Sequence, residues 1–96
     1  MNKEFTSEEI IKLITDRNKS EHLTIEESVI KDTDFEGCDL TNITFRLCSF
    51  ENCNLAGANF SGSSISGTLF RECPMHACRF VNTDMTEAIF RDIDLS

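Results

Sequence analysis

Five cysteines carry most of this sequence's capacity for chemistry, and four of them fall into two pairs. Cys48 and Cys53 are five residues apart, and so are Cys73 and Cys78. Four thiolates can hold a tetrahedral zinc ion, but the usual zinc knuckle places two residues between its paired cysteines. Because the spacing here differs, we expect no metal and no other cofactor, and we interpret the cysteines as small core residues.

Cys73 and His76 form the other candidate arrangement, since a histidine can activate a nearby thiol. Such a nucleophile needs a cleft and a third group that orients the histidine, and the sequence shows no third group beside this pair. The sequence also contains no glycine-rich phosphate loop, no Ser-His-Asp order and no motif of paired carboxylates. We therefore predict that the protein is not an enzyme and has no catalytic residues.

A period of five residues determines how these side chains are positioned. From Ile25 onward every fifth residue is large and apolar, and a second series, two residues earlier, is mostly small and contains all five cysteines. The large series is Ile25, Ile30, Phe35, Leu40, Phe45, Phe50, Leu55, Phe60, Ile65, Phe70, Met75, Phe80, Met85, Phe90 and Leu95. Five residues advance an α-helix by about 140° and turn a flat strand over. The chain must therefore turn once per repeat, which is typical of a solenoid.

The repeats resemble those of the pentapeptide repeat family, in which a small residue, Asp or Asn, and Leu or Phe are followed by two polar or small residues. Good matches are Cys38-Asp39-Leu40-Thr41-Asn42, Cys53-Asn54-Leu55-Ala56-Gly57, Ala58-Asn59-Phe60-Ser61-Gly62 and Thr83-Asp84-Met85-Thr86-Glu87. The resemblance covers about residues 23–96. It implies an all-β solenoid, a right-handed quadrilateral β-helix of about 3.5–4 coils, with four pentads in each coil.

In that geometry the large and the small series point inward and residues twenty apart stack at about 4.8 Å. Ile30, Phe50, Phe70 and Phe90 then form one interior column. Cys53 and Cys73 fall together in another column, close enough for a disulfide, although we expect them to stay reduced.

Residues 1–22 are expected to form a capping helix and a linker ahead of the solenoid at 23–96. Thr6 and Glu9 have the spacing of a capping box, and Phe5 and Ile10 occupy the positions of a hydrophobic staple. The apolar residues that follow lie on one stripe of a helix from about Ser7 to Arg17. A solenoid needs such a lid because an open end exposes its core.

The charge excludes several partners. Seventeen acidic residues against nine Lys and Arg give a formal charge of -8, so direct binding of nucleic acid or of an anionic membrane is not expected. We see neither a secretory signal nor an apolar segment long enough to span a bilayer. A reduced, cytoplasmic protein is the expectation, with export by a signal-less route left open.

Two surfaces are candidate protein interfaces. The outward column Val29, Ser49, Leu69 and Ile89, here called the apolar strip, has three apolar residues where the family pattern has Asp, Asn or another polar residue, and arginines and carboxylates flank it. The last coil has no lid, so its apolar side chains are expected to be bare and to pair with a second copy, as in end-to-end dimers of the family, or with another protein. The candidate interface residues are Val29, Leu69, Ile89, Arg71, Arg91, Phe90, Ile93 and Leu95.

These features predict a non-enzymatic interaction module, a rigid rod that docks a protein partner or itself. The alternative, implied by the resemblance, is a DNA mimic that binds DNA gyrase or topoisomerase IV and protects against gyrase poisons. The acidic balance fits a mimic, but a rod of about 17 Å would match only about five base pairs. An effector or accessory component of a bacterial secretion or toxin system is a third interpretation, which no residue specifically supports.

Overall fold

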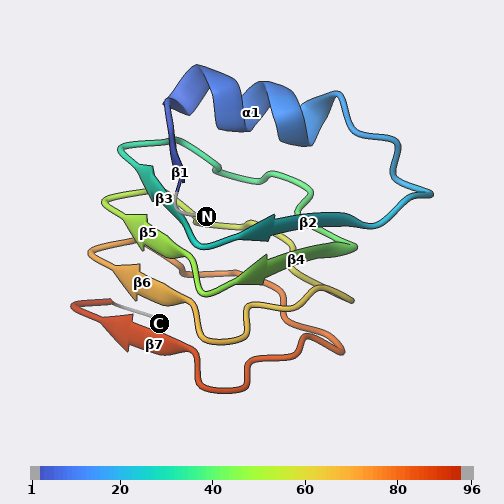
Figure 1. The fold of residues 1–96 in the computed structure, drawn as a ribbon. Coiled ribbons are helices and arrows are strands. Elements are labelled where there is room, and N and C mark those ends of the chain that lie inside the picture. The colour runs from blue at the N-terminus through green and yellow to red at the C-terminus, as the bar shows by residue number, and fades with distance from the viewer. Residues whose placement is uncertain (1–2, 94–96) are drawn as a thin grey trace.

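Successive coils of the chain stack in a parallel register of twenty residues (Figure 1). The structure is a computed structural model that describes residues 3–93. Its elements are β1 (Lys3–Phe5), α1 (Ser7–Thr15), β2 (Leu23–Glu26), β3 (Ser28–Lys31), β4 (Ile43–Arg46), β5 (Ser49–Glu51), β6 (Leu69–Arg71) and β7 (Ile89–Arg91). Ile30 pairs with Phe50, Phe50 with Phe70 and Phe70 with Phe90. The expected quadrilateral β-helix with a short N-terminal helix is confirmed.

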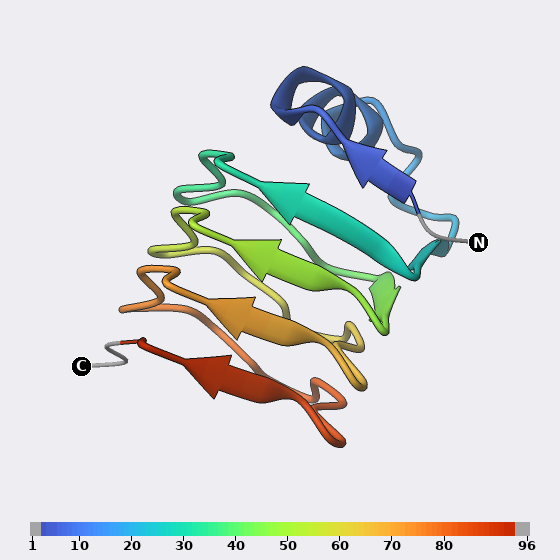
Figure 2. The ribbon, with the colours of Figure 1, turned by 60° about the vertical axis from the view of Figure 1, so that its left-hand side comes forward.

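One side of the rod is a continuous sheet and the others are held by shorter contacts. The sheet has the strand order β1-β3-β5-β6-β7, and β2 pairs with β4 on the adjacent side. Figure 2 shows the five strands of the larger sheet stacked along the rod, with α1 at its upper end. On the side opposite this sheet the coils meet through isolated bridges, such as Asn59 with Asp39 and with Arg79.

The chain turns at one residue of every pentad. From Glu27 to Asp92 every fifth residue has a positive φ, between 49° and 73°. Gly, Asn and Asp tolerate this left-handed conformation best, and they occupy most of these corners. The left-handed residue at each corner therefore turns the chain, so that four repeats of five residues form one square coil.

Phenylalanine rings fill the interior. The Phe70 ring stacks on Phe50 at 4.9 Å and on Phe90 at 5.2 Å between centroids. Phe60 stacks on Phe80 at 5.6 Å in the column of the opposite side. Full burial of a side chain of this kind contributes about 1.5–3 kcal/mol, so these columns account for much of the stability of a thin rod.

The small inward series supplies hydrogen-bond donors as well as volume. The Cys53 thiol donates to the Ile30 carbonyl at 3.4 Å, and the Cys73 thiol donates to the Phe50 carbonyl at 3.4 Å. Thr68 makes the same kind of bond, from its hydroxyl to the Phe45 carbonyl at 2.8 Å. All five cysteines are free, and within residues 3–93 no cluster of potential metal ligands is present.

The N-terminal segment covers the first coil with a helix and an additional strand. The capping box is confirmed, because the Glu9 amide donates to Thr6 Oγ1 at 3.1 Å and the Thr6 amide donates to Glu9 Oε1 at 2.9 Å. Ile10 and Ile14 are buried against the coil below. Strand β1, which was not predicted, adds to the sheet by pairing in parallel with β3.

The helix ends at Thr15 with Asp16 as its C-cap, two residues before the predicted end at about Arg17. The Arg17 side chain turns back toward main-chain carbonyls. Its guanidinium donates to the carbonyls of Ile14 at 2.7 Å, Asp39 at 3.0 Å and Thr41 at 3.1 Å. The last two carbonyls lie on the first coil, on a side with no strand above it in the described chain. Arg17 therefore satisfies carbonyls that a further coil would otherwise bond.

The last described coil is less well covered than the prediction of a uniformly buried interior implied. Met85 occupies a central position of a pentad but is 37% exposed. Phe90 and Ile93 are half-buried and pack against the core, so they are not bare. No helix in the described part of the chain is long and apolar enough to cross a membrane.

Candidate protein-binding face

The apolar strip lies on the outer surface of the larger sheet. Strands β3, β5, β6 and β7 align Val29 with Ser49, Ser49 with Leu69, and Leu69 with Ile89. Val29 and Leu69 are half-buried, and Ile89 is 48% exposed. At about 4.8 Å per coil the strip is about 14 Å long. Register alone thus places three apolar side chains in one outward row.

Leu47, at the corner between β4 and β5, enlarges this apolar surface. It is 50% exposed, and its side chain extends along the rod over Gly67, since a Cβ on Gly67 would lie 2.7 Å from Leu47 Cδ2. Sequence reasoning missed Leu47 because the corner positions were treated only as solvent-facing. The available signal was a leucine in a series otherwise made of Gly, Ala, Asn, Asp and Glu.

Leu47 is unfavourable for the isolated fold in two respects. Its φ is 54°, and the left-handed conformation costs an ordinary residue about 1–2 kcal/mol. Its exposure leaves apolar surface in water. A residue that breaks a local rule without helping the fold marks a functional surface more often than chance.

The same sheet has a row of charged residues immediately beside the strip: Lys31, Glu51, Arg71 and Arg91. Lys31 pairs with Glu4 at 3.4 Å and Arg71 lies 3.7 Å from Glu72. Within residues 3–93, Arg91 has no ion-pair partner. At the end of this face formed by β6 and β7, two arginines therefore lie beside apolar residues, with Glu72, Glu87 and Asp92 close to them in the chain.

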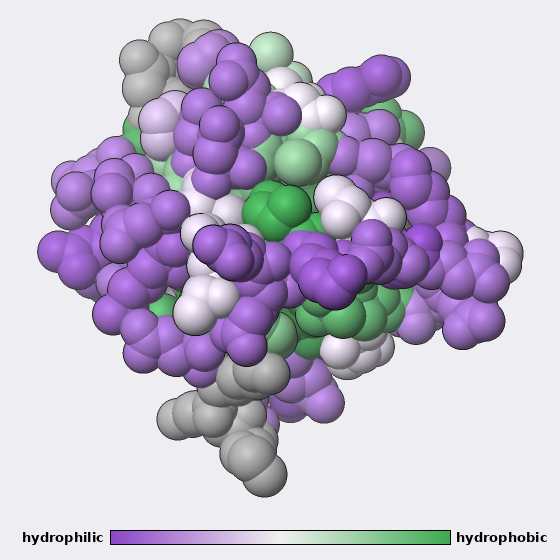
Figure 3. Space-filling model, turned by 90° about the horizontal axis from the view of Figure 1, so that it is seen from above, coloured by the Kyte–Doolittle hydropathy of each residue, from purple (hydrophilic) through white to green (hydrophobic). Residues whose placement is uncertain are grey.

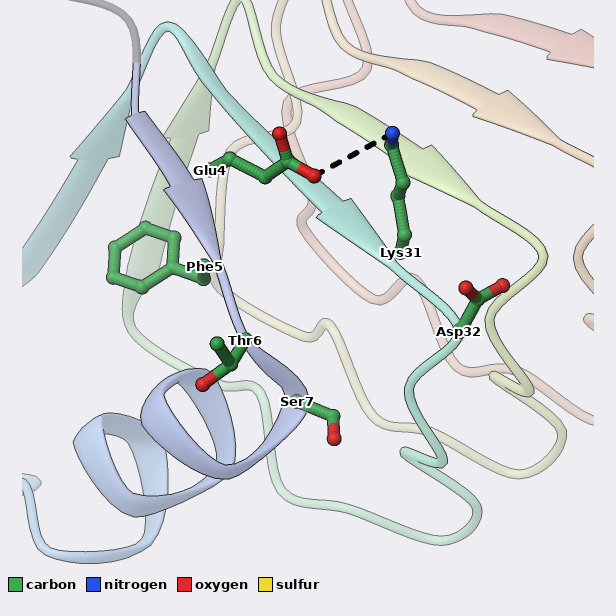
Figure 4. Close-up of a pocket in the computed structure, with 6 residues that line it drawn as sticks. All are labelled: Glu4, Phe5, Thr6, Ser7, Lys31 and Asp32. Atoms are coloured by element: carbon green, nitrogen blue, oxygen red, sulfur yellow. Dashed lines mark ion pairs between the residues drawn. The ribbon is translucent and has the colours of Figure 1, made fainter.

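Two hollows flank the N-terminal end of the rod. One, of about 520 Å³, lies at the junction of β1, α1 and β3, and Figure 4 shows the Glu4 carboxylate directed toward the Lys31 ammonium at its edge. The other, an open groove of about 720 Å³, runs beside α1 and includes Phe5, Leu13 and Leu23. Seen from the helix end in Figure 3, apolar surface appears in small areas between hydrophilic residues. Neither hollow brings together groups with catalytic geometry.

The cysteines are structural, as predicted. Cys73 is 1% exposed and donates its thiol inward, whereas His76 is exposed, so the two do not form a nucleophile pair. Burial raises the pKa of the Cys48 and Cys78 thiols, which keeps them protonated and unreactive. His22 binds the side chains of Asn42 and Thr44 at 2.8 and 2.5 Å, so it belongs to the linker's own hydrogen bonds.

The remaining candidate interface residues do not join the strip. Phe90 and Ile93 point into the last coil, and Leu95 lies outside the described residues. Arg71 and Arg91 are exposed beside the strip. The structure thus groups Val29, Leu69, Ile89, Arg71 and Arg91 on one face and assigns the two inward residues to the core.

These features define a pentapeptide-repeat solenoid, with four pentads to a coil and an apolar strip on one side. The sequence matches the family model for the pentapeptide repeat region over residues 43–96, and the chain belongs to this family. The search of curated proteins finds no match.

Two solved structures share the fold. One is QnrB1, a plasmid-mediated fluoroquinolone resistance protein, with a TM-score of 0.50 and 24% identity, over 76% of this chain and 46% of QnrB1. The other is the pentapeptide repeat protein Rfr23 from the cyanobacterium Cyanothece 51142, with a TM-score of 0.53 and 16% identity, over 73% of this chain and 52% of Rfr23. The match covers about half the length of each of these structures.

Proposed function

We propose that the protein is a non-enzymatic interaction module that docks a protein partner through the apolar strip and Leu47. The observation that carries this proposal is the alignment of apolar side chains on one outward face. Leu47 strengthens it, because this residue exposes apolar surface in a backbone conformation that disfavours leucine. The family to which the chain belongs consists generally of structural or interaction proteins, which fits a role without catalysis.

The charges beside the strip define the chemistry of the partner. Arg71 and Arg91 are exposed next to Leu69 and Ile89, and the rest of the chain is acidic overall. A partner that presents apolar side chains, with carboxylates only opposite Arg71 and Arg91, would match this face, because carboxylates elsewhere would be repelled by the acidic surface of the chain. A purely polar surface would leave the apolar strip without a matching contact.

The strip can be tested with a matched pair of double variants. Leu69→Asp with Ile89→Asp places two carboxylates on the strip, and Asn59→Asp with Asn82→Asp adds the same charge on the opposite side. Aspartate is compatible with the fold at the strip positions, because Asp84 and Asn59 occupy equivalent positions and accept hydrogen bonds from backbone amides. In pull-downs from the native host we expect the first variant to lose the captured partner and the second to retain it. Equal capture by both variants would remove the strip from the proposal.

A DNA mimic is the second candidate, supported by the net charge of -8 and by a fold shared with a fluoroquinolone resistance protein. The basic residues of the sheet interrupt the acidic surface on one side, which weakens this candidate. A gyrase supercoiling assay separates the two. Inhibition or protection at micromolar protein, with a steep loss as salt rises, would support the mimic, whereas docking through apolar residues varies little with salt.

The last coil is a further proposed contact, in which Phe90 and Ile93 would meet their equivalents in a second copy. Both side chains are half-buried in the described structure, and Met85 beside them is exposed. Met85→Asp should weaken such a contact and leave the sheet face unchanged. Identical sizing profiles for this variant and the wild type at high concentration would speak against the end contact.

A further inference from the structure

We propose that the occupant of the apolar strip is a second copy of this chain, packed side by side with its rod pointing in the same direction. The inference rests on the proposed function of the strip as a protein-binding surface and names its partner. In this arrangement a two-fold axis parallel to the rods relates the two larger sheets, which pack face to face.

The pattern of charge on the face is the first argument. The strip lies between two outward columns, the sheet residues Lys31, Glu51, Arg71 and Arg91 on one side and the corner residues Glu27, Leu47, Gly67 and Glu87 on the other. Rotation about an axis parallel to the rod exchanges these columns. Arg91 then lies opposite Glu87 of the second copy, and Lys31 lies opposite Glu27 of the second copy. Each contact occurs twice, and within these two columns no like charges meet. Glu4 of β1 pairs with Val29 and continues the strip column, so it meets its own equivalent on the axis, with Lys31 of the same copy 3.4 Å away.

The exposure of Arg91 and Glu87 in a single copy is consistent with an ion pair between two copies. Arg91 and Glu87 are both exposed, and within residues 3–93 neither has an ion-pair partner. They belong to the same coil and flank Ile89 on opposite sides. The pairing thus uses charges that the single chain leaves exposed to solvent, beside the most exposed residue of the strip.

The apolar residues fit the same arrangement. On the axis, Leu69 meets Leu69 of the second copy and Ile89 meets its own equivalent, so the strip covers itself. Arg71 lies opposite Gly67 of the second copy, over which the Leu47 side chain extends. The aliphatic stem of the arginine would cover Leu47 there, which accounts for an exposed leucine at a strained corner.

The opposite orientation, with the rods antiparallel, is less complementary. It would keep each column facing itself in reversed order, so that Lys31 would oppose Arg91 and Glu27 would oppose Glu87. Only Glu51 and Arg71 would gain an opposite charge. Like charges in direct opposition weaken an interface, so the charge pattern favours the same-direction pairing.

The face is small, so we expect a weak dimer that forms as concentration rises. Sedimentation equilibrium of the full chain up to millimolar concentration should show a monomer–dimer equilibrium. Leu69→Asp with Ile89→Asp should abolish the dimer, and Asn59→Asp with Asn82→Asp should leave it intact. Thermal melts of each variant exclude loss of fold as the cause.

Charge reversal tests the orientation. Arg91→Glu alone and Glu87→Arg alone should each weaken the dimer about tenfold, because two attractive contacts become repulsive. An equimolar mixture of the two variants should recover the wild-type affinity, since each copy then supplies the charge that the other lacks. If either single reversal strengthens the dimer, the antiparallel orientation is correct and the proposed one is wrong.

Two further outcomes would overturn the inference. One is a dimer that the strip variant leaves intact, which would place the contact elsewhere, for example at the last coil. The other is a wild-type monomer at every concentration. If that monomer still captures a host protein through the strip, the proposed function stands while the inference of a second copy fails.

Discussion

The two opposite sides of this rod use the same repeat position in different ways. On one side, Asp39 and Asn59 precede the central positions of their pentads and each accepts a hydrogen bond from the backbone amide two residues later, at 2.9 and 3.0 Å. On the sheet side the same position is occupied by Val29, Leu69 and Ile89. On the first side these outward side chains form hydrogen bonds that stabilise the fold. The second side lacks those hydrogen bonds at Val29, Leu69 and Ile89 and exposes apolar surface instead, and this difference is the basis of the proposed docking role.

Both sides depend on one interior, so the largest effect should come from the core they share. Phe70→Ala should destabilise the protein by about 3–5 kcal/mol, because the ring lies between Phe50 and Phe90 and is fully buried. Its outward neighbour Leu69 should tolerate Asp with a far smaller loss. Chemical denaturation of the two variants measures this, and equal losses would contradict the assignment of inward and outward residues.

The side of Asp39 and Asn59, here called the polar side, is held at its N-terminal end by Arg17, whose side chain is 5% exposed. Arg17→Met keeps most of the packing volume but leaves the carbonyls of Asp39 and Thr41 without this donor. We expect a loss of about 1.5–3 kcal/mol, with the sheet side unaffected in its binding. Amide hydrogen exchange should show the loss concentrated in α1 and the first coil, and uniform acceleration throughout the rod would count against this role.

Asp39, on the polar side, should also give the protein a pH-dependent stability. A hydrogen bond from Lys19 and two from Thr41 hold the pKa of the Asp39 carboxyl well below its usual range. The stability that this carboxylate contributes is therefore complete at neutral pH and is lost as the pH falls below the ordinary aspartate range. Because Asp39 is partly exposed, the effect should be modest. Asp39→Asn should flatten the fall of melting temperature on acidification, and an unchanged pH profile would refute the assignment.

The smallest effect on stability should come from substitution of Leu47, which should stabilise the protein, whereas the substitutions above destabilise it. Leu47→Asn places at φ 54° a residue type that already occupies three equivalent corners, Asn42, Asn52 and Asn82. We expect a gain of up to about 1 kcal/mol, together with weaker docking through the strip. Denaturation and binding measured on the same variant should therefore show higher stability and weaker binding. Loss of stability without a change in binding would show that Leu47 serves only the fold.

Much of this architecture could be predicted because it is determined locally. The period of five places Phe50, Phe70 and Phe90 in one column, and the capping box of Thr6 and Glu9 requires only four residues. The alignment of Leu69 with Ile89 follows from the same arithmetic. These features depend on spacing, which the sequence contains in full.

The features that were missed depend on where coils begin and end. Strand β1 forms because the first coil offers an unpaired edge at β3, and three residues contain no signal for that. Arg17 donates to carbonyls twenty-two and twenty-four residues away, and no local pattern contains that contact. Met85 is exposed although its position in the pentad is an interior one. The position of Leu47 over Gly67 likewise depends on the stacking of two coils.

The most direct test of the account records the methyl NMR spectrum of the wild-type chain as its concentration is raised. We predict that the methyl signals of Leu47, Leu69 and Ile89 shift together along a single binding curve. Val81, which is 56% exposed on the opposite side, should keep its position throughout. Shifts at Val81 with none at the three sheet-side residues, or no shift at any of them, would contradict self-docking through the strip.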